Sequence, residues 1–229
     1  MENLWEDLYS KKQEEAMMKF PFSIVMELAN FYTKKYPNMK PEDINVLEIG
    51  CGSGSNIKYL AGLGYNVYGI DISKTAVNYA KQSFIKSNLK GHIETASVDK
   101  LPFQDEFFHI VIEHGVLMCV YEDIYVKAID EIHRVMTGGG ISLLTPKSEI
   151  NTAGIKLKAD KYDNNCVFKD TGIYINNVNL SAVIKILNNR FNIVFLRRND
   201  RIDYTLSKDN STVVDEKVNS IYHIFIEKI

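Results

Sequence analysis

The stretch NVLEIGCGSGSNIKYLAGLGYNVYGID, residues 45–71, decides the fold of this chain. It begins with the apolar run VLEI, which is followed at once by the glycine-rich loop Gly50–Gly54. Glycine allows tight turns and has no Cβ that would keep a ligand away from the backbone. A helical pattern and a second apolar run follow, and that run ends on Asp71. This order is typical of a nucleoside-binding βαβ unit, in which the acid accepts hydrogen bonds from ribose hydroxyls.

The spacing of the glycines distinguishes between classes of cofactor. A dinucleotide fingerprint reads G-x-G-x-x-G/A, whereas here the third position of that pattern is Ser55 and the glycine comes earlier, at Gly54. Glu48 also lies inside the first strand, just before Ile49 and the loop. A carboxylate at this position would repel a pyrophosphate and suits a cofactor that carries a positive amino group.

The phrases LEIGCGSG (residues 47–54) and GIDIS (residues 69–73) resemble the first two motifs of class I S-adenosylmethionine-dependent methyltransferases of type 11 or type 25. The resemblance covers residues 45–146, under half of the chain. It implies a Rossmann-like α/β fold with a mostly parallel sheet, a C-terminal antiparallel strand and helices on both faces. It also implies S-adenosylmethionine as the cofactor and S-adenosylhomocysteine as the product.

The same resemblance implies a role for each cofactor-binding position. Asp71 would accept charge-assisted hydrogen bonds from both ribose hydroxyls, and Ile72 would lie on the adenine face. Val98 and Asp99 would meet the adenine edge, while Ser97 stands where many family members have an acid. The candidate cofactor-binding residues are Glu48, Gly50, Cys51, Gly52, Gly54, Asp71, Ile72, Ser97, Val98, Asp99 and Glu113.

His114 is the candidate catalytic residue. It follows the apolar run at residues 110–112, and the pKa of histidine suits proton transfer near neutrality. The alternative is that His114 only shapes the pocket, since a base is needed only when the acceptor has a proton that must leave early. Glu113 competes for the role of base, but contact with the cofactor or orientation of His114 is favoured. His133 and Arg134 are expected to be structural.

Three aromatic residues, Trp5, Tyr9 and Tyr121, are candidates for contact with the substrate, because together they can form an aromatic wall near a positively charged sulfonium. N-terminal helices in this family often close over cofactor and substrate, and ordinary packing is the alternative. Residues 147–178 are rich in Asn, Asp and Lys and predict a loop that helps to choose the acceptor.

The chain is interpreted as one methyltransferase domain, residues 1–229. It has an N-terminal helical cap (1–44), a cofactor-binding core (45–146) and a substrate loop with the final strands (147–229). Further expected elements are a helix beginning at Pro21, a helix capped by Ser73, a helix over 122–136, strands over 141–145, 191–196 and 221–226, a helix over 180–189, and a long polar connection over 199–219.

Composition narrows the possible partners and the compartment. A net charge of −2 and a pI of about 6.2 give no electrostatic reason to expect nucleic acid as a partner. The three cysteines are widely spaced and form no C-x-x-C pair, so neither a disulfide framework nor a metal site is expected. No apolar signal core or membrane-length run is present, which predicts a cytoplasmic protein without a membrane partner. The oligomeric state is left open.

The expected reaction is methyl transfer to an oxygen or nitrogen nucleophile of a small-molecule acceptor, such as a sugar or another metabolite. No Asn-Pro-Pro-Tyr or Asp-Pro-Pro-Tyr signature follows the fourth strand, where this chain has Glu113-His114-Gly115-Val116. Two alternatives stay open: a non-catalytic cofactor-binding or scaffold protein with this fold, and a methyltransferase that acts on a macromolecule.

Overall fold

The computed structural model describes residues 2–12, 15, 17–148, 155–156, 166–167, 174–206 and 213–229. Its helices are α1 (Glu2–Lys12), α2 (Ser23–Lys35), α3 (Ser55–Gly62), α4 (Lys74–Lys86), α5 (Glu122–Val135), α6 (Leu180–Leu187) and the short 3-10 helices η2 (Pro41–Asp43) and η3 (Leu117–Cys119). The strands are β1 (Asn45–Ile49), β2 (Asn66–Asp71), β3 (His92–Thr95), β4 (Phe108–Glu113), β5 (Met136–Leu144), β6 (Lys147–Ser148), β7 (Ile155–Lys156), β8 (Cys166–Val167), β9 (Tyr174–Ile175), β10 (Asn177–Val178), β11 (Phe191–Leu206) and β12 (Val213–Lys228).

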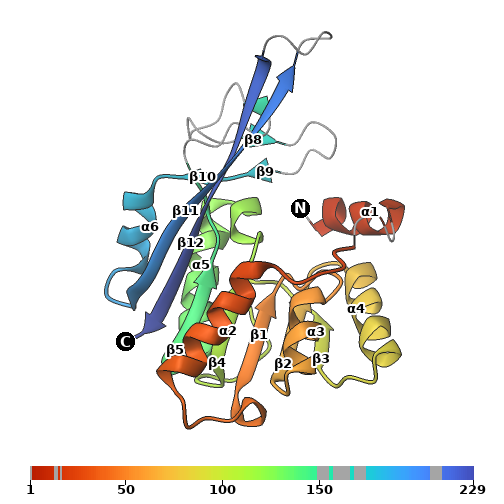
Figure 1. Cartoon of the computed structure of the whole chain (residues 1–229), viewed down its shortest axis with the longest axis vertical. Helices are drawn as coiled ribbons and strands as arrows, with labels where there is room; N and C mark the ends of the chain where they lie inside the picture. Colours follow the sequence, from red (N-terminus) through yellow and green to blue (C-terminus); the bar gives the residue numbers. More distant parts are fainter. Residues whose placement is uncertain are drawn as a thin grey trace.

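One sheet runs through the molecule in the order β10-β6-β12-β5-β4-β1-β2-β3, and β11 pairs with β12 (Figure 1). The strands β3, β2, β1, β4 and β5 are parallel to one another, whereas β12 is antiparallel to both β5 and β11. The expected sheet, mostly parallel with an antiparallel C-terminal strand, is confirmed. Because the chain moves outward from β1 to β3 and then returns to β4 on the other side of β1, a crevice is expected at the carboxyl ends of β1 and β4.

Helices cover both faces of the sheet, as Figure 1 shows for α2 and α3 in front and α5 behind. Alternation along β1 explains the two layers, because successive side chains of a strand point to opposite faces. Leu47 is buried in the cluster that includes Ile129 of α5, whereas Val46 is buried in the cluster that includes Leu28 of α2. Each fully buried aliphatic side chain of this kind contributes about 1.5–3 kcal/mol to folding.

The prediction of a long polar connection over 199–219 was the least accurate one. Instead of a long connection, β11 and β12 continue through most of it as an antiparallel ladder, with Asn199 opposite Ile221 and Arg201 opposite Asn219. The ribbon extends past the end of the sheet (Figure 1). Backbone pairing does not require apolar side chains, and a two-stranded ribbon tolerates polar residues on both faces, so hydrophobic periodicity underestimates its length.

Other boundaries differ by a few residues. α2 begins at Ser23 rather than Pro21, with Phe22 as its N-cap residue, and it buries the expected apolar face that includes Ile24 and Tyr32. β5 begins at Met136, which places the three glycines in the strand rather than before it. Ser73 caps α4 as expected, because its hydroxyl accepts a hydrogen bond from the Ala76 N–H at 3.1 Å.

Candidate functional site

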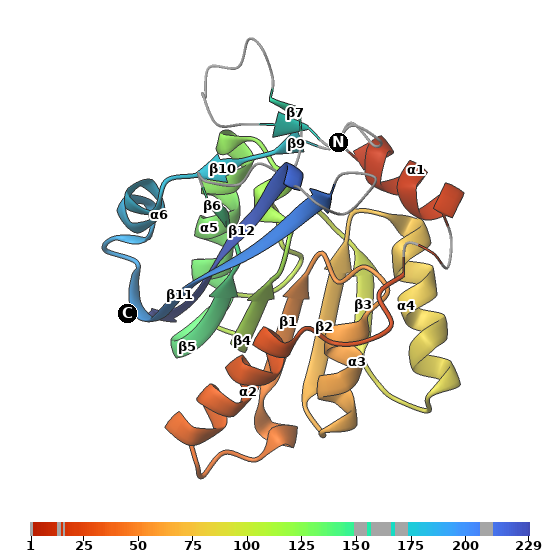
Figure 2. The same ribbon diagram turned by 45° about the horizontal axis from the view of Figure 1, so that its top comes forward.

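The predicted site residues gather where β1, β2 and β4 end, at the upper edge of the sheet in Figure 2. The glycine loop follows β1, Asp71 is the last residue of β2, and His114 comes directly after β4. They surround a first cavity of about 300 Å³. The predicted residues that line the first cavity are Trp5, Tyr9, Gly50, Asp71, Ile72, Ser97, Val98, Asp99 and His114.

The glycine loop has a backbone that other residues cannot adopt without strain. Gly50 and Gly52 have φ angles of +65° and +52°. A Cβ on Gly50 would lie 2.1 Å from Val116 Cγ2, and a Cβ on Gly52 would lie 2.9 Å from the Tyr9 hydroxyl. The loop is therefore glycine-rich both for its left-handed turns and because neighbouring groups approach its backbone closely.

Asp71 connects the glycine loop with the start of α4. Its Oδ2 accepts a hydrogen bond from Gly52 N at 2.9 Å, and its Oδ1 accepts one from Ser73 N at 2.9 Å. Burial raises the pKa of the Asp71 carboxyl, while these N–H groups and that of Ile72 act in the opposite direction. Since each carboxylate oxygen accepts more than one hydrogen bond, both oxygens retain capacity for ribose hydroxyls.

Glu48 is buried at the end of β1 and is held by Asn56, a residue that the sequence interpretation missed. Asn56 Nδ2 donates to Glu48 Oε1 at 2.6 Å, and Asn56 Oδ1 accepts from Phe22 N at 2.9 Å. Glu48 Oε2 is buried and has no hydrogen-bond partner among the described residues. Burial raises the pKa of the Glu48 carboxyl to about 8. A buried carboxylate oxygen without a partner is the feature expected of a site for a cationic group.

A second cavity of about 530 Å³ adjoins the first. The two share four lining residues, Tyr9, Gly50, His114 and Gly115. The second cavity includes Glu48, Cys51 and Gly52 on the side of the glycine loop, and residues of β6, β11 and β12 on the opposite side. Lys147 begins the loop that was expected to choose the acceptor, whereas Asn199, Arg201 and Asn219 were missed because they fall in the span that resembled a connection.

His114 lies where the two cavities meet. Its ring stacks on Phe22, with ring centroids 3.8 Å apart and planes at 23°. Burial, together with the charges of His223 and Lys147, lowers the pKa of His114 to about 4. The imidazole is therefore neutral at pH 7 and able to accept a proton.

The helix α1 covers the first cavity and brings Trp5 and Tyr9 to it, with their ring centroids 6.3 Å apart. Glu6 of the same helix fixes this arrangement, which the sequence did not reveal. Its carboxylate accepts hydrogen bonds from Ser73 Oγ at 2.6 Å and from Thr75 Oγ1 at 2.5 Å. These hydroxyls lower the pKa of Glu6. Figure 2 shows α1 across the N-terminal end of α4.

Glu6→Gln is expected to weaken binding of S-adenosylhomocysteine by about five- to tenfold, since hydrogen bonds to a charged group contribute about 1.5–3 kcal/mol and the amide keeps part of them. Fluorescence of Trp5, the only tryptophan in the chain, reports the position of α1 during the titration. Asp7→Asn is the matched control, because Asp7 is exposed on the same helix and pairs only with Lys11 in the described contacts. Equal affinities for the two variants would contradict this role of Glu6.

Three predicted residues lie elsewhere than expected. The Glu113 carboxylate is fully buried and accepts hydrogen bonds from the N–H groups of Val116, Leu117 and Thr145 at 2.8–2.9 Å. It shapes the loop that carries His114 rather than facing the cofactor. The side chain of Tyr121 is 53% exposed and lines neither cavity. Gly54 also lines neither cavity and serves as the N-cap residue of α3.

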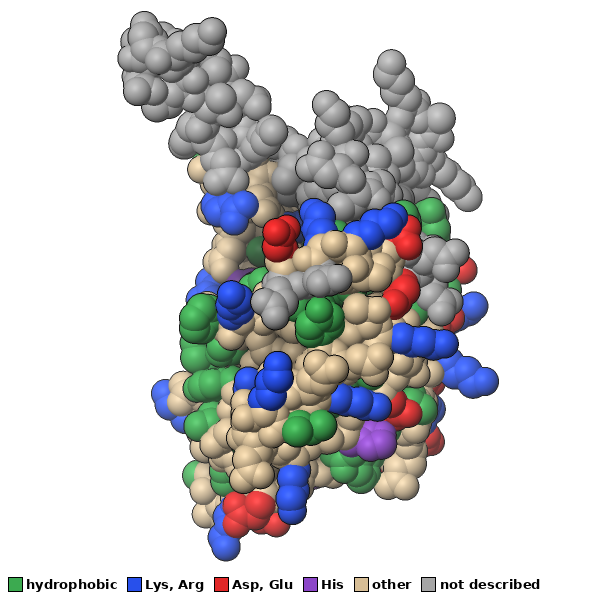
Figure 3. Space-filling view, turned by 90° about the vertical axis from the view of Figure 1, so that its right-hand side faces the viewer, with side chains coloured by type: hydrophobic (Ala, Val, Ile, Leu, Met, Phe, Trp, Pro, Cys, Tyr) green, Lys and Arg blue, Asp and Glu red, His purple; other side chains and the backbone are tan. Residues whose placement is uncertain are grey.

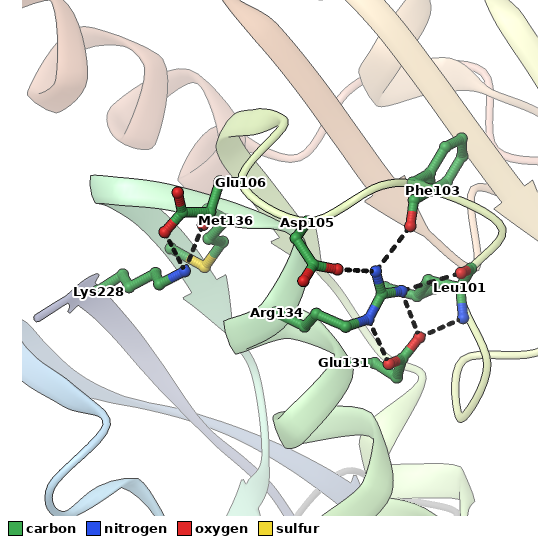
Figure 4. Close-up of polar contacts among 8 residues, drawn as sticks. All are labelled: Leu101, Phe103, Asp105, Glu106, Glu131, Arg134, Met136 and Lys228. Atoms are coloured by element: carbon green, nitrogen blue, oxygen red, sulfur yellow. Dashed lines mark hydrogen bonds and ion pairs between the residues drawn. The ribbon is translucent and has the colours of Figure 1, made fainter.

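Arg134, expected to be structural, joins α5 to the loop before β4 (Figure 4). Its guanidinium donates to Glu131, to Asp105 and to the carbonyl oxygens of Leu101 and Phe103, at distances of 2.7–3.1 Å. Glu131 in turn accepts a hydrogen bond from Leu101 N at 2.7 Å. This network holds the loop after Asp99 in place and is not part of either cavity.

The charges on one face of the molecule are mixed in sign (Figure 3). Figure 3 shows one face of the molecule, on which Lys and Arg side chains are interspersed with Asp and Glu rather than gathered into a basic patch. Among the helices of the described residues, none has the length and apolar character needed to cross a membrane.

The two cavities fit S-adenosylmethionine, as three independent features indicate. The oxygen of Glu48 without a partner suits the ammonium group, the carboxylate of Asp71 suits the ribose hydroxyls, and the close backbone at Gly50 suits the part between them. The residues present therefore match a cofactor with a cationic amino acid end and a nucleoside end.

Known proteins agree with this assignment. The family profile of the methyltransferase domain matches residues 47–144. A protein from Haemophilus influenzae is 34% identical over 105 residues, which is 44% of this chain and 42% of the relative. A Schizosaccharomyces pombe protein called an uncharacterized methyltransferase is 44% identical over 66 residues, 22% of this chain and 46% of the relative. The chain thus matches less than half the length of these relatives.

The fold is also shared with solved structures of low sequence identity. A Burkholderia thailandensis structure, 1,6-didemethyltoxoflavin-N1-methyltransferase with bound 1,6-didemethyltoxoflavin and S-adenosylhomocysteine, has a TM-score of 0.70 at 12% identity, and the comparison covers 99% of this chain and 86% of that chain. Four observations point to the same family: the glycine loop, the acid that ends β2, the family profile and the shared fold. Residues 47–144 of this chain thus match the methyltransferase domain family, and the chain shares its fold with solved S-adenosylmethionine-dependent methyltransferases.

Proposed function

We propose that this protein transfers the methyl group of S-adenosylmethionine to an oxygen or nitrogen atom of a small-molecule acceptor. The observation that carries the proposal is the pair of cavities that meet at Gly50 and His114. The first cavity contains the residues directed at ribose and adenine. The second begins at Glu48 and extends to the C-terminal hairpin. Their junction is the place where a methyl group and an acceptor meet.

When bound, the cofactor supplies a methyl group on a positively charged sulfur, which is already a strong electrophile. The chain has to orient the reactants in line and exclude water, and such orientation contributes about 7–11 kcal/mol to catalysis. Glu48 and Asp71 fix the two ends of the cofactor. Tyr9 of α1 lines both cavities at the junction, Trp5 lines the first cavity, and the Phe22 ring lines the second beside His114.

His114 is proposed as the general base for an acceptor that carries a proton. Its low pKa keeps the ring neutral, and its position on both cavities places it beside the acceptor. The same low pKa makes it a weak base for an unactivated hydroxyl. It therefore suits an acceptor whose proton becomes acidic as the bond to the methyl group forms.

His114→Gln is expected to lower kcat by about 100-fold or more, the usual contribution of a general base. Because the pKa of His114 is about 4, kcat measured at saturating S-adenosylmethionine should be constant from pH 6 to 8 and fall only as pH approaches that value. The measurement is the pH profile of methyl transfer, with the Kd of S-adenosylhomocysteine as a control for binding. A variant with nearly full kcat would show that His114 only shapes the pocket.

A small acceptor is favoured by the size of the second cavity, since about 530 Å³ lies within the usual range of small-molecule sites. The relatives point to different acceptors. A Bartonella tribocorum protein named ubiquinone biosynthesis O-methyltransferase is 30% identical over 76 residues. A Staphylococcus epidermidis protein named ribosomal protein L11 methyltransferase is 29% identical over 139 residues. A macromolecular acceptor is therefore kept as the second candidate.

The proposal is tested by calorimetric titration of S-adenosylhomocysteine into the purified protein, with NAD as the control ligand. Binding of the first compound and not of NAD is expected. A screen of small sugars and phenols, followed by a screen of protein and RNA acceptors, then detects turnover as release of S-adenosylhomocysteine. Binding without turnover on any acceptor would favour a cofactor-binding scaffold. A folded protein that ignores S-adenosylhomocysteine would overturn the proposal.

A further inference from the structure

Thr145 is the residue that follows β5, and it lies beside the loop that carries His114. β5 runs parallel to β4, with Leu143 opposite Ile112, so the residues that follow the two strands are neighbours. The Thr145 side chain is fully buried and lines neither cavity. A buried hydroxyl is unfavourable unless it forms hydrogen bonds, so its partners indicate what it does.

The hydroxyl of Thr145 contacts the backbone on both sides of His114. Its Oγ1 accepts a hydrogen bond from Gly115 N at 2.9 Å and donates one to the carbonyl oxygen of Glu113 at 3.3 Å. A hydroxyl has one proton and two lone pairs, so it can form both bonds at once. Because peptide units are planar, the first bond fixes the peptide plane that follows the His114 Cα, and the second fixes the plane that precedes it. Together these planes set the direction in which the His114 side chain leaves the backbone.

The side chain of Glu113 joins the same segment to β5. Its Oε2 accepts a hydrogen bond from Thr145 N at 2.9 Å. Its Oε1 accepts hydrogen bonds from the N–H groups of Val116 and Leu117 at 2.8–2.9 Å. The turn that carries His114 beyond the end of β4 is therefore attached to both the backbone and the side chain of Thr145.

The ring of His114 is held at its far end by Phe22. The two rings stack with their centroids 3.8 Å apart, and the backbone N–H of Phe22 is itself bound to Asn56 Oδ1. Backbone and ring of His114 are thus fixed from two different sides. A catalytic group has to stay within about 0.5 Å of its productive position, and a misplacement of about 1 Å can lower a rate about 100-fold.

We propose that Thr145 is a positioning residue for methyl transfer, whose hydroxyl holds the backbone of His114 and so sets the place of the imidazole where the two cavities meet. The inference rests on the proposed function, because it deepens the role given to His114 there. Thr145 lines neither cavity, so it acts on the reaction through His114 and not through contact with cofactor or acceptor.

NMR of the His114 ring protons tests this directly, in the protein saturated with S-adenosylhomocysteine. The stacked Phe22 ring shifts these protons upfield, and His114→Gln assigns them. Thr145→Val, which has a similar shape but no hydroxyl, should move them toward the position of an exposed histidine, and Thr145→Ser should restore them. The pKa of His114, about 4 in the wild type, should rise toward 6.5 in Thr145→Val by about one unit or more, because a displaced ring is better hydrated.

Thr137→Val is the matched control. Thr137 lies near the other end of β5, where its hydroxyl donates to the carbonyl oxygen of Phe108 in β4 at 3.3 Å. This variant removes a hydroxyl from the same pair of strands and should leave the resonances and the pKa of His114 unchanged. If Thr145→Val does not fold, Thr145→Ala also removes the hydroxyl and has the same expected results. The Gly115 amide of the wild type should be protected from hydrogen exchange, and free exchange would overturn the inference without any variant.

Activity gives a second readout once the acceptor screen has found turnover. Thr145→Val should lower kcat by about ten- to 100-fold and leave the Kd of S-adenosylhomocysteine nearly unchanged. In a His114→Gln background it should cause no further loss, because residues that act as a unit are not additive. A wild-type position of the His114 ring in folded Thr145→Val, or an equally large loss of kcat with and without His114, would each overturn the inference.

The experiments distinguish failure of this inference from failure of the proposed function. If S-adenosylhomocysteine does not bind, the proposed function fails, and the NMR comparison of Thr145→Val with the wild type is made on the free protein, where the hydroxyl and the stacked rings are still present. If His114→Gln keeps nearly full kcat, the base is wrong and Thr145 has no link to catalysis. If the ligand binds and the ring stays in place in the valine variant, only the role of Thr145 is wrong.

Discussion

Replacement of Asp71 by alanine is expected to weaken binding of S-adenosylhomocysteine by about 100-fold or more. The carboxylate would lose two charge-assisted hydrogen bonds to the ribose hydroxyls, each of about 1.5–3 kcal/mol, and about 1.4 kcal/mol corresponds to a tenfold change in Kd. The loss is increased by an indirect effect, because the same carboxylate holds Gly52 N and Ser73 N at 2.9 Å. Without it the glycine loop and the start of α4 lose their common anchor.

Calorimetry of folded variants measures the effect. Asp71→Asn keeps one acceptor oxygen but sets an amide N–H₂ against a backbone N–H, so an intermediate Kd is expected. Asp130→Ala serves as the control, since Asp130 is exposed on α5 and pairs with Arg190 at 2.8 Å, away from both cavities. A Kd for Asp71→Ala within about threefold of the wild-type value would rule out ribose recognition by this residue.

Glu48→Gln is expected to stabilise the free protein at pH 8 and, at the same time, to weaken cofactor binding. The Glu48 carboxyl has an ordinary pKa of 4.5 when the chain is unfolded and a pKa of about 8 in the buried site. Between these values the unfolded state releases a proton that the folded state keeps, so the folding stability of the wild type falls as pH rises and becomes constant above pH 8. Glutamine has no such proton.

The difference between the two proteins therefore depends on pH. At pH 4.5 their Tm values should differ little, because the carboxyl is protonated in the folded state and still half protonated in the unfolded state. At pH 8 the variant should be more stable by several degrees, since each pH unit of the window corresponds to up to about 1.4 kcal/mol, and about 1 kcal/mol shifts Tm by about 2–4 °C in a chain of this size. Thermal unfolding followed by circular dichroism measures this.

Glu113→Gln is the contrasting control for Glu48→Gln. Glu113 is equally buried, but both of its oxygens accept backbone hydrogen bonds, from Val116 and Leu117 on one side and Thr145 on the other. An amide N–H₂ there faces N–H donors, so this variant should be less stable than the wild type at pH 8. If Glu48→Gln and Glu113→Gln changed Tm in the same direction, the distinction between Glu48, which has an oxygen without a partner, and Glu113, whose two oxygens both accept hydrogen bonds, would be wrong.

Cofactor binding at the same residue has the opposite dependence. Binding of the ammonium group of S-adenosylhomocysteine requires ionised Glu48. The wild-type protein should therefore release up to one proton on binding near pH 7. Its affinity should rise with pH, by up to about tenfold for each unit until pH 8. Titration in buffers of different ionisation enthalpy measures that proton. Glu48→Gln should release none and bind about tenfold or more weakly.

The cofactor half of the site was predictable because its contacts are short in sequence. Strand, glycine loop, helix and acid follow one another within residues 45–71, and the loop from Ser97 to Asp99 follows the next strand. In a parallel sheet the carboxyl ends of these strands lie together whatever the rest of the chain does. The positions of Gly50, Gly52 and Asp71 therefore followed from local pattern alone.

Residues that position the site were harder to predict. Glu6 meets Ser73 across 67 positions of the chain, and Asn56 connects Glu48 with the backbone of Phe22. Neither contact leaves a periodic signal, since a single polar residue on a helix is equally compatible with exposure to water. Tyr121 shows the converse case, because its aromatic character predicted a contact that the start of α5 directs away from both cavities.

The far side of the second cavity was decided mainly by tertiary structure. Lys147 and His223 belong to segments 76 positions apart, and they share a cavity wall because β12 pairs with β5 and β6 in one particular register. A shift of that register by one residue would turn every side chain of β12 to the opposite face. By itself the sequence determined the fold and the positions of the glycine loop and Asp71 at one edge of the sheet, because local backbone geometry determines them. Only the folded sheet determined the wall opposite the glycine loop, because strand pairing, which polar residues do not encode, sets which side chains line the second cavity.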